Sequence, residues 1–227
     1  MDPAFYVEVI RILLVLVIVT AAAIITIRDV HILFTGYAFQ SLLLALVAFS
    51  LYAETGELTL IGVGVATILS KTLIIPWFMG RIHGDMKFHR DVEFHILSPT
   101  TSVIISAAIL FVIHYSFQRF AAVLELDTIH YLGTIFGILL TFMGLLVMFS
   151  RKKPITKIVG YLTMENGVLL FSLFFAALPL VFEAIVTVDL IVLVLLSTIL
   201  AFGEESDVES FQRRLMPFHT WILEEDE

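Results

Sequence analysis

The chain has 227 residues, of which 59% are apolar and 15% are charged, and its mean hydropathy is +1.02. Soluble domains are close to half apolar and about a quarter charged, so this composition excludes an ordinary soluble domain and indicates an integral membrane protein. The absence of cysteine excludes disulfides, a thiolate metal site and a cysteine nucleophile. The formal net charge of −8 does not point to nucleic-acid binding, because the basic residues cluster in short loops.

Seven stretches are long and apolar enough to cross a bilayer, which takes roughly 20 residues of helix. In chain order they cover about 5–27, 30–52, 57–80, 98–118, 129–150, 155–178 and 182–203. The first is too long for a signal peptide and follows an acidic residue, Asp2, so we expect a membrane helix there. Pro99, Pro154 and Pro179 stand near segment ends, where proline is tolerated. The expected fold is an all-α bundle of about seven transmembrane helices.

Lysine and arginine are distributed very unevenly between the two sets of loops. One set, which includes the N-terminus, holds only Arg119. The opposite set holds ten basic residues, namely Arg28, Arg81, Lys87, Arg90, Arg151, Lys152, Lys153, Lys157, Arg213 and Arg214. Because basic loops remain in the cytoplasm, we expect a multi-pass protein of the cell membrane with its N-terminus outside and its C-terminus in the cytoplasm.

We expect three parts along the chain. Residues 1–118 form an N-terminal four-helix membrane part, and residues 119–203 form a three-helix membrane part. Residues 204–227 form a polar, acidic tail in the cytoplasm.

Three ionisable residues, Lys71, Glu165 and Asp189, lie inside predicted membrane segments. A charge at the bilayer centre costs about 2.5–3.5 kcal/mol on insertion scales, so such residues face a bundle interior, water or a partner. A helix rises about 1.5 Å per residue, which places Glu165 roughly 15 Å deep, at the midplane. The same rise places Lys71 roughly 21 Å, and Asp189 roughly 10 Å, from the outer side. We therefore expect three separate groups at three depths.

Each of these residues has a structural and a functional interpretation. Glu165 can form an ion pair that only joins helices, or it can gain and lose a proton during ion movement. Lys71, five residues before Pro76, can extend toward the cytoplasmic surface or take part in the same chemistry. We expect Lys71, Glu165 and Asp189 to serve proton or ion translocation. Tyr161 shares a helical stripe with Glu165, and Asn166 lies about 100° around the helix, where it can bond a neighbouring helix.

The remaining polar residues carry weaker signals. Glu8 and Arg11 are three residues apart and can pair with each other. His114 and His130, near the outer ends of two segments, are either interfacial residues or part of a proton exit. The small residues of "GVGVAT" (62–67) favour close helix packing.

Three further histidines, His83, His89 and His95, recur every six residues. This spacing does not place them on one helical face, so we expect no metal site. The chain has no constellation of cofactor ligands or of a nucleophile with its base, so we expect neither a cofactor nor catalysis in this chain.

Several blocks of the sequence resemble one family over most of the chain. They are "GYAFQSLLLALVAF" (36–49), "ILSKTLIIPWFM" (68–79), "GYLTMENGVLLFSL" (160–173), "FEAIVTVDLIVLVLLSTI" (182–199) and "SDVESFQRRL" (206–215). On these blocks the chain resembles the HyfE-type membrane subunit, component E of hydrogenase-4 and formate hydrogenlyase complexes. Its last three segments also resemble the NuoK subunit of respiratory complex I and the MrpC subunit of cation/proton antiporters.

The resemblance implies a non-catalytic subunit of a group-4 [NiFe]-hydrogenase or complex I-like assembly, whose buried charges carry protons across the membrane. Its partners would be antiporter-like and other membrane subunits. The NuoK motif reads G-L-E-x-M-x-N, whereas residues 160–166 read G-Y-L-T-M-E-N, so the glutamate is displaced by three residues to Glu165. That shift is near one helical turn. Asp189 stands where the last NuoK-like helix also tends to carry an acid.

Two other functions are compatible with the same residues. The chain can be a subunit of a multisubunit cation/proton antiporter without redox chemistry. It can also be a structural linker that holds larger pumping subunits in place.

Overall fold

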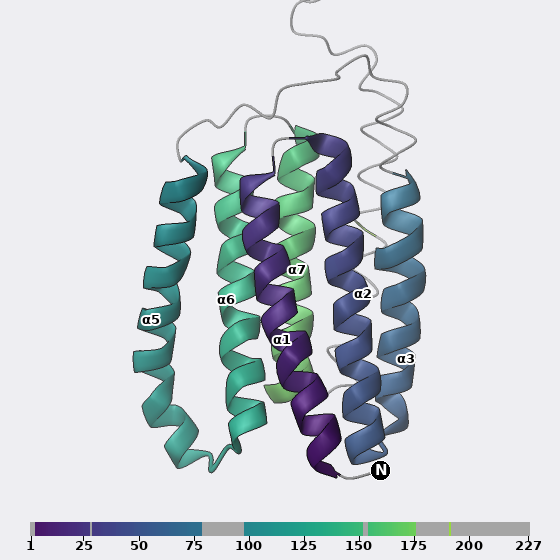
Figure 1. Ribbon diagram of the computed structural model, residues 1–227, viewed down its shortest axis with the longest axis vertical. Helices are drawn as coiled ribbons and strands as arrows, with labels where there is room; N and C mark the ends of the chain where they lie inside the picture. The colour runs from purple at the N-terminus through teal and green to yellow at the C-terminus, as the bar shows by residue number, and fades with distance from the viewer. Residues whose placement is uncertain (1–2, 28, 79–97, 152–153, 176–190, 192–227) are drawn as a thin grey trace, which may run out of the picture. The chain divides into compact units, whose positions relative to one another are not determined.

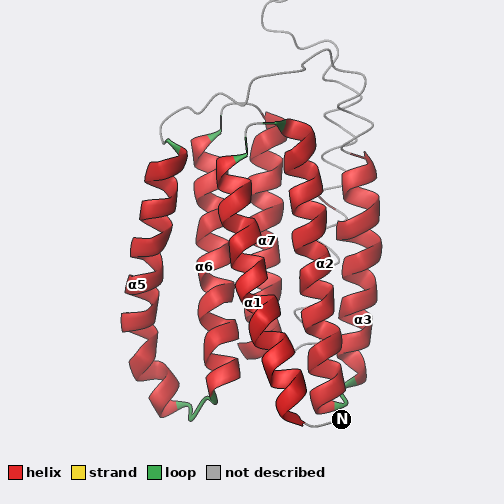
Figure 2. Ribbon diagram, in the orientation of Figure 1, coloured by secondary structure: helices red, strands yellow, loops and turns green. Residues whose placement is uncertain are grey.

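A computed structural model describes residues 3–27, 29–78, 98–151, 154–175 and 191 (Figure 1). Its elements are α1 (Pro3–Thr26), α2 (Val30–Thr55), α3 (Leu58–Thr67), the π-helix η1 (Ile68–Ile74), α5 (Pro99–Val123), α6 (Thr128–Ser150) and α7 (Pro154–Phe175). Figure 2 shows that these described ranges contain helices joined by short loops and no strand. The all-α class is therefore confirmed.

Six of the described helical segments are long and apolar enough to cross a membrane, with α3 and η1 together forming one of them. This agrees with a multi-pass membrane protein. Apart from residue 191, the predicted seventh segment, 182–203, lies outside the described residues, as do Pro179, Asp189, the histidines of the 81–97 loop and the acidic tail. The total of seven helices, the three-part division of the chain and its orientation in the membrane stay predictions.

The helix ends follow local sequence signals. Asp29 and Asp127 precede α2 and α6, and their carboxylates accept backbone N–H groups of the first turn, as good N-caps do. Gly56, with φ of 76°, ends α2 in the left-handed conformation that glycine adopts without strain. Pro99 and Pro154 are the first residues of α5 and α7, where a missing N–H costs nothing.

The helices make contact in a connected order. α2 packs against α1, α3, η1 and α7, while α6 packs against α1, α5 and α7. In Figure 1, α5 and α3 stand at opposite edges of the described helices. Most of the α7 span is buried, whereas most of the α5 span is exposed. α7 is therefore the helix whose polar residues are most shielded by the rest of the chain.

Glycines bring the backbones of α6 and α7 into direct contact. A Cβ atom on Gly144 would collide with the backbone nitrogen of Met164, and one on Gly167 would collide with that of Thr141. Small residues allow such close approach between membrane helices, where packing replaces the hydrophobic effect as a driving force. Glu165 lies one turn or less from both contacts, so the glycines fix its position relative to α6.

The predicted close packing at "GVGVAT" holds for one of its two glycines. A Cβ atom on Gly64 would lie 2.6 Å from the ring of Phe49 on α2. Gly62, two residues earlier, has no neighbouring atom within 4 Å of such a position. The absence of a side chain at Gly64 therefore allows α3 to pack closely against α2, whereas Gly62 makes no such contact.

Candidate functional site

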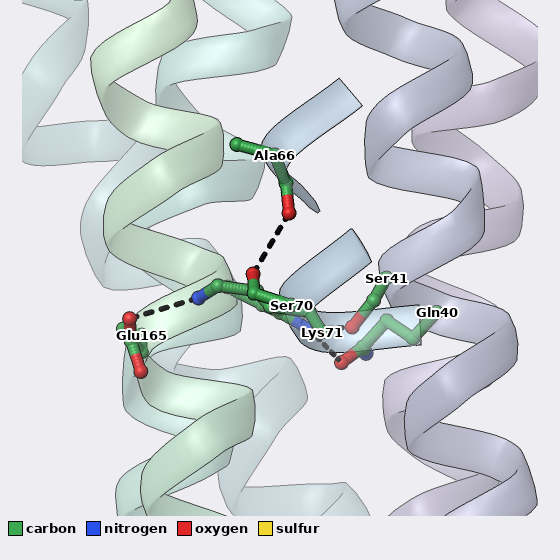
Figure 3. A network of polar contacts seen from close by, with 7 residues as sticks. Gln40, Ser41, Ala66, Ser70, Lys71 and Glu165 are labelled. Carbon is green, nitrogen blue, oxygen red and sulfur yellow. Dashed lines mark hydrogen bonds and ion pairs between the residues drawn. The ribbon is translucent and has the colours of Figure 1, made fainter. Parts of the chain in front are cut away.

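The most unusual feature of the described bundle is a buried ion pair between η1 and α7. Lys71 Nζ lies 2.9 Å from Glu165 Oε1, and the side chains are 0% and 6% exposed, respectively. Figure 3 shows Lys71 extending from η1 toward Glu165, while Gln40 and Ser41 project from α2. We call Lys71 and Glu165 the buried pair. Removing two charges from water is costly, and their mutual attraction offsets the cost only when the geometry is close.

Lys71 occupies a position that helix geometry assigns to the core. The buried residues of α3 and its continuation include Leu60, Val63, Thr67, Lys71 and Ile75, which follow the three- and four-residue spacing of one helical face. An apolar side chain would fill this position without desolvating a charge. The lysine is therefore held inside the bundle and does not extend to the membrane surface.

The backbone around Lys71 departs from α geometry. At the end of η1 the N–H of Ile75 donates to the carbonyl of Ser70, five residues back. In this register residue 76 would donate to the carbonyl of Lys71, but Pro76 has no N–H. Short π-helical stretches inside helices frequently occur at functional sites. Lys71 therefore lies in the stretch that departs from α geometry, five residues before Pro76.

The side chain next to Glu165 connects α7 to α2. Asn166 Nδ2 donates to Gln40 Oε1 at 3.2 Å and to Ser41 Oγ at 3.1 Å, and all three residues are completely buried. The expectation that Asn166 bonds a neighbouring helix is confirmed. Sequence reasoning did not single out Gln40 or Ser41, although an amide inside the apolar run "GYAFQSLLLALVAF" was the signal that could have identified them.

The structure therefore brings two of the three predicted ionisable groups together. We expected Lys71 and Glu165 to be separate and at different depths, but they are in contact. Asp189 lies outside the described residues. Tyr161, predicted to support Glu165, is partly buried one turn away on α7.

The two histidines form a different cluster, between α5 and α6. Tyr131 Oη lies 2.9 Å from His114 Nδ1, which ties α6 to α5. His130 Nδ1 lies 2.6 Å from Asp127 Oδ1, at the N-terminus of α6. Burial acts to raise the pKa of Asp127, but hydrogen bonds from the backbone and ring of His130, with the charge of that ring, hold it below its ordinary value of 3.8. The described contacts do not connect this cluster to the buried pair.

Arg151, which we counted among the loop charges, has an unexpected position. Its side chain is buried, and NH2 donates to the carbonyls of Ile24, Ile25 and Ile27 at 3.0, 3.2 and 2.8 Å. The last carbonyls of a helix lack partners within that helix, and cations near them are favourable. Burial lowers the pKa of Arg151 to about 10, so it stays charged at neutral pH. Arg151 therefore caps the end of α1 from the end of α6.

The geometry indicates charge chemistry at the buried pair and gives no support for a metal centre. Among the described residues no three histidine, aspartate or glutamate side chains cluster closely enough to hold a metal ion. A carboxylate in contact with an ammonium group can stay charged in a buried place, and it loses that stabilisation when the lysine moves away. The buried pair therefore consists of two ionisable groups whose charges depend on contact with each other.

The comparisons with known proteins do not identify a family. No protein-family model matches the chain, and no solved structure matches it. The chain is 24% identical over 177 residues to the uncharacterized protein Rv0085 of Mycobacterium tuberculosis (strain ATCC 25618 / H37Rv). The alignment covers 76% of this chain and 78% of Rv0085.

Proposed function

We propose that the chain is a non-catalytic membrane subunit that contributes buried charges to proton or sodium translocation in a group-4 [NiFe]-hydrogenase, formate hydrogenlyase or complex I-like assembly. The observation that carries the proposal is the pair of Lys71 and Glu165, 2.9 Å apart and shielded from solvent. Ionisable residues inside membrane segments are costly and usually functional. The sequence resemblance to HyfE-type and NuoK-type subunits supports the choice of assembly.

The proposed mechanism is an exchange of partners at Glu165. While Lys71 is in contact, Glu165 remains a carboxylate and carries no proton. When a neighbouring charge draws Lys71 away, the buried carboxylate loses its counter-ion and takes up a proton; when the lysine returns, that proton is released. Two charges some 8 Å apart at an effective dielectric near 20 interact by about 2 kcal/mol. That energy changes a protonation equilibrium by more than tenfold.

The orientation and the partners form part of the same proposal. Basic loops place the N-terminus outside the cell membrane and the C-terminal tail in the cytoplasm. Redox chemistry in another subunit would supply the charge that moves Lys71, and antiporter-like membrane subunits would continue the proton path. Asp189 and the His114–His130 region would contribute further titratable groups along that path.

The test requires the assembly that co-purifies with the chain, reconstituted in proteoliposomes. We expect Glu165→Gln to remove most proton uptake, measured with a pH-sensitive dye during turnover, because glutamine cannot hold a proton. The double variant Lys71→Gln with Glu165→Gln leaves no unpaired buried charge and should give the same loss in a stable protein. Glu8→Gln, which removes an exposed carboxylate, is the matched control and should leave uptake unchanged. Normal pumping by an intact assembly that carries the double variant would refute the proposal.

One observation favours the structural linker as a second function. The buried pair joins η1 to α7 by side chains, and a fully compensated pair can hold two helices together without titrating. A linker would assemble poorly in the single variants and pump normally in the double variant. Identification of the co-purifying subunits separates the hydrogenase-type assembly from a cation/proton antiporter.

A further inference from the structure

Three buried polar atoms near the buried pair have no hydrogen-bond partner among the described residues. They are Gln40 Nε2 on α2, Thr72 Oγ1 on η1 and Asn166 Oδ1 on α7. Each belongs to one of the three elements that meet at the pair, and Thr72 and Asn166 directly follow Lys71 and Glu165 in the chain. Thr134 Oγ1 on α6 is also buried without a partner among the described residues, but it belongs to another part of the bundle. The preceding residue, Gly133, packs against Phe174, which lies nine residues beyond Glu165 on α7.

Such atoms require an explanation in a folded protein. A buried donor or acceptor without a partner costs about 1–3 kcal/mol, so nearly all such groups bind protein or ordered water. Gln40 Nε2 is a donor and Asn166 Oδ1 is an acceptor, and they belong to amides whose other ends are 3.2 Å apart. A water molecule is a donor and an acceptor at once, so it satisfies both.

A water molecule can bridge the two amides in either orientation of their side chains. Oxygen and nitrogen of a side-chain amide exchange places when the group is rotated by half a turn. If both amides were rotated, Gln40 would donate to Asn166, and the atoms left over would be an oxygen on Gln40 and a nitrogen on Asn166. The same water then satisfies them with its roles reversed.

We infer that α2, η1 and α7 enclose a binding site for ordered water, in which at least one water molecule bridges the amides of Gln40 and Asn166 beside the buried pair. A buried water typically makes about three hydrogen bonds, and Thr72 Oγ1 on η1 is a further buried hydroxyl without a partner among the described residues. If the proposed function holds, this water is the first carrier of the proton that leaves Glu165. The water accepts that proton and passes one of its own toward α2.

The sequence offers a selective probe, because Asn166 is the only asparagine in the chain. Full-length protein labelled with ¹⁵N-asparagine and embedded in lipid bilayers gives one side-chain amide signal in solid-state NMR. Magnetisation that starts on water reaches this amide only when water lies next to it. We expect rapid transfer from water to the Asn166 amide in the wild-type chain.

Two variants locate the water. Gln40→Met keeps the length of the side chain and removes one of the two bridged amides, so transfer to Asn166 should fall severalfold. Thr163→Val is the matched control, because Thr163 is also completely buried on α7 but its hydroxyl donates to the carbonyl of Val159 at 2.8 Å. It should leave the transfer unchanged.

The outcomes separate the water site from the proposed function. A wild-type Asn166 amide that receives no magnetisation from water would overturn the site, and this measurement needs no variant to fold. Transfer that is equally fast in Gln40→Met would overturn the bridge. Wild-type transfer that Gln40→Met abolishes, together with normal proton uptake in the Lys71→Gln and Glu165→Gln double variant, would uphold the water site and refute only the proton-carrying function.

Discussion

Two ion pairs of nearly equal length occupy opposite environments in this protein. Lys71 and Glu165 lie 2.9 Å apart, on two different elements, and are 0% and 6% exposed. Arg11 and Glu8 lie 2.8 Å apart on one helix, three residues from each other, and are 43% and 60% exposed. The second pair was predicted from spacing alone, whereas the first requires the tertiary fold.

The comparison shows that distance alone says little about what an ion pair does. The exposed pair lies in the first two turns of its membrane span, where each long side chain can reach the interface if the two separate, so its formation changes little. The buried pair cannot separate without a second partner for each charge, whether a proton, a water molecule or another side chain. Of the two pairs, the buried one is therefore the one on which the proposed function depends.

The largest expected effect comes from removing one member of the buried pair. Glu165→Gln or Lys71→Gln alone leaves one buried charge without its partner, which costs roughly 3–5 kcal/mol of unfolding free energy. Denaturant titration in bicelles measures this loss. The double variant should recover most of the stability, because neither glutamine is charged. A double variant as unstable as the sum of the two single variants would show that the pair makes no specific contribution.

The next effect tests how α7 positions Glu165. Gly167→Ala places a methyl group against the backbone of Thr141, and we expect overpacking to cost about 1–3 kcal/mol in the same titration. Gly62→Ala is the control, because nothing lies within 4 Å of its added carbon. That substitution should stabilise α3 by up to about 1 kcal/mol. Equal effects at the two glycines would contradict the backbone contact between α6 and α7.

A smaller effect is expected at Asp127, which forms an exposed pair with His130 and also caps α6. Asp127→Ala should cost about 1 kcal/mol, and Asp127→Asn less, because asparagine still accepts the first-turn N–H. The folded-state pKa of Asp127 is below its ordinary value, so its contribution is complete above that value and is lost as the pH falls through the lower, folded-state pKa. The stability difference between wild type and Asp127→Ala should shrink in acid. A difference that grows in acid would contradict the assignment.

The smallest effect is expected at the exposed pair of Arg11 and Glu8. Arg11→Gln breaks the exposed pair and should cost about 0.3–0.5 kcal/mol, as for other helix pairs at this spacing. The effect should decrease in high salt, because exposed charges are screened, whereas the loss at the buried pair should change little. A salt-independent loss of several kcal/mol at Arg11 would show that this face of α1 is covered by another subunit.

The sequence was sufficient for much of the fold, because length and apolarity determine which segments can cross a membrane. Pro99 and Pro154, expected near segment ends, are the first residues of α5 and α7. The same reasoning identified Lys71 and Glu165 individually, since charges in apolar runs are conspicuous. Their contact could not be predicted, because hydropathy gives depth along a helix and contains no information on which helices are neighbours.

The other residues of the site were missed for related reasons. Gln40 and Ser41 are uncharged, so they barely reduce the hydropathy of their segment, and only the contact with Asn166 gives them a role. Arg151 follows a membrane segment and resembles an ordinary cytoplasmic loop charge. Its burial depends on the end of α1, some 124 residues earlier in the chain, beside which α6 ends.

The cap that Arg151 places on α1 has a consequence for biosynthesis. When the first helix leaves the translocon, Arg151, which will bind the carbonyls of Ile24, Ile25 and Ile27 at its end, has not yet been translated. Until then water or a lipid headgroup must bind these carbonyls, and α6 displaces that solvent when it docks. A nascent chain that stops after α5 should therefore expose the end of α1 to hydrogen exchange, and synthesis of α6 should close it. α1 is thus synthesised first, but the carbonyls at its end receive their protein partner only after α6 has been made.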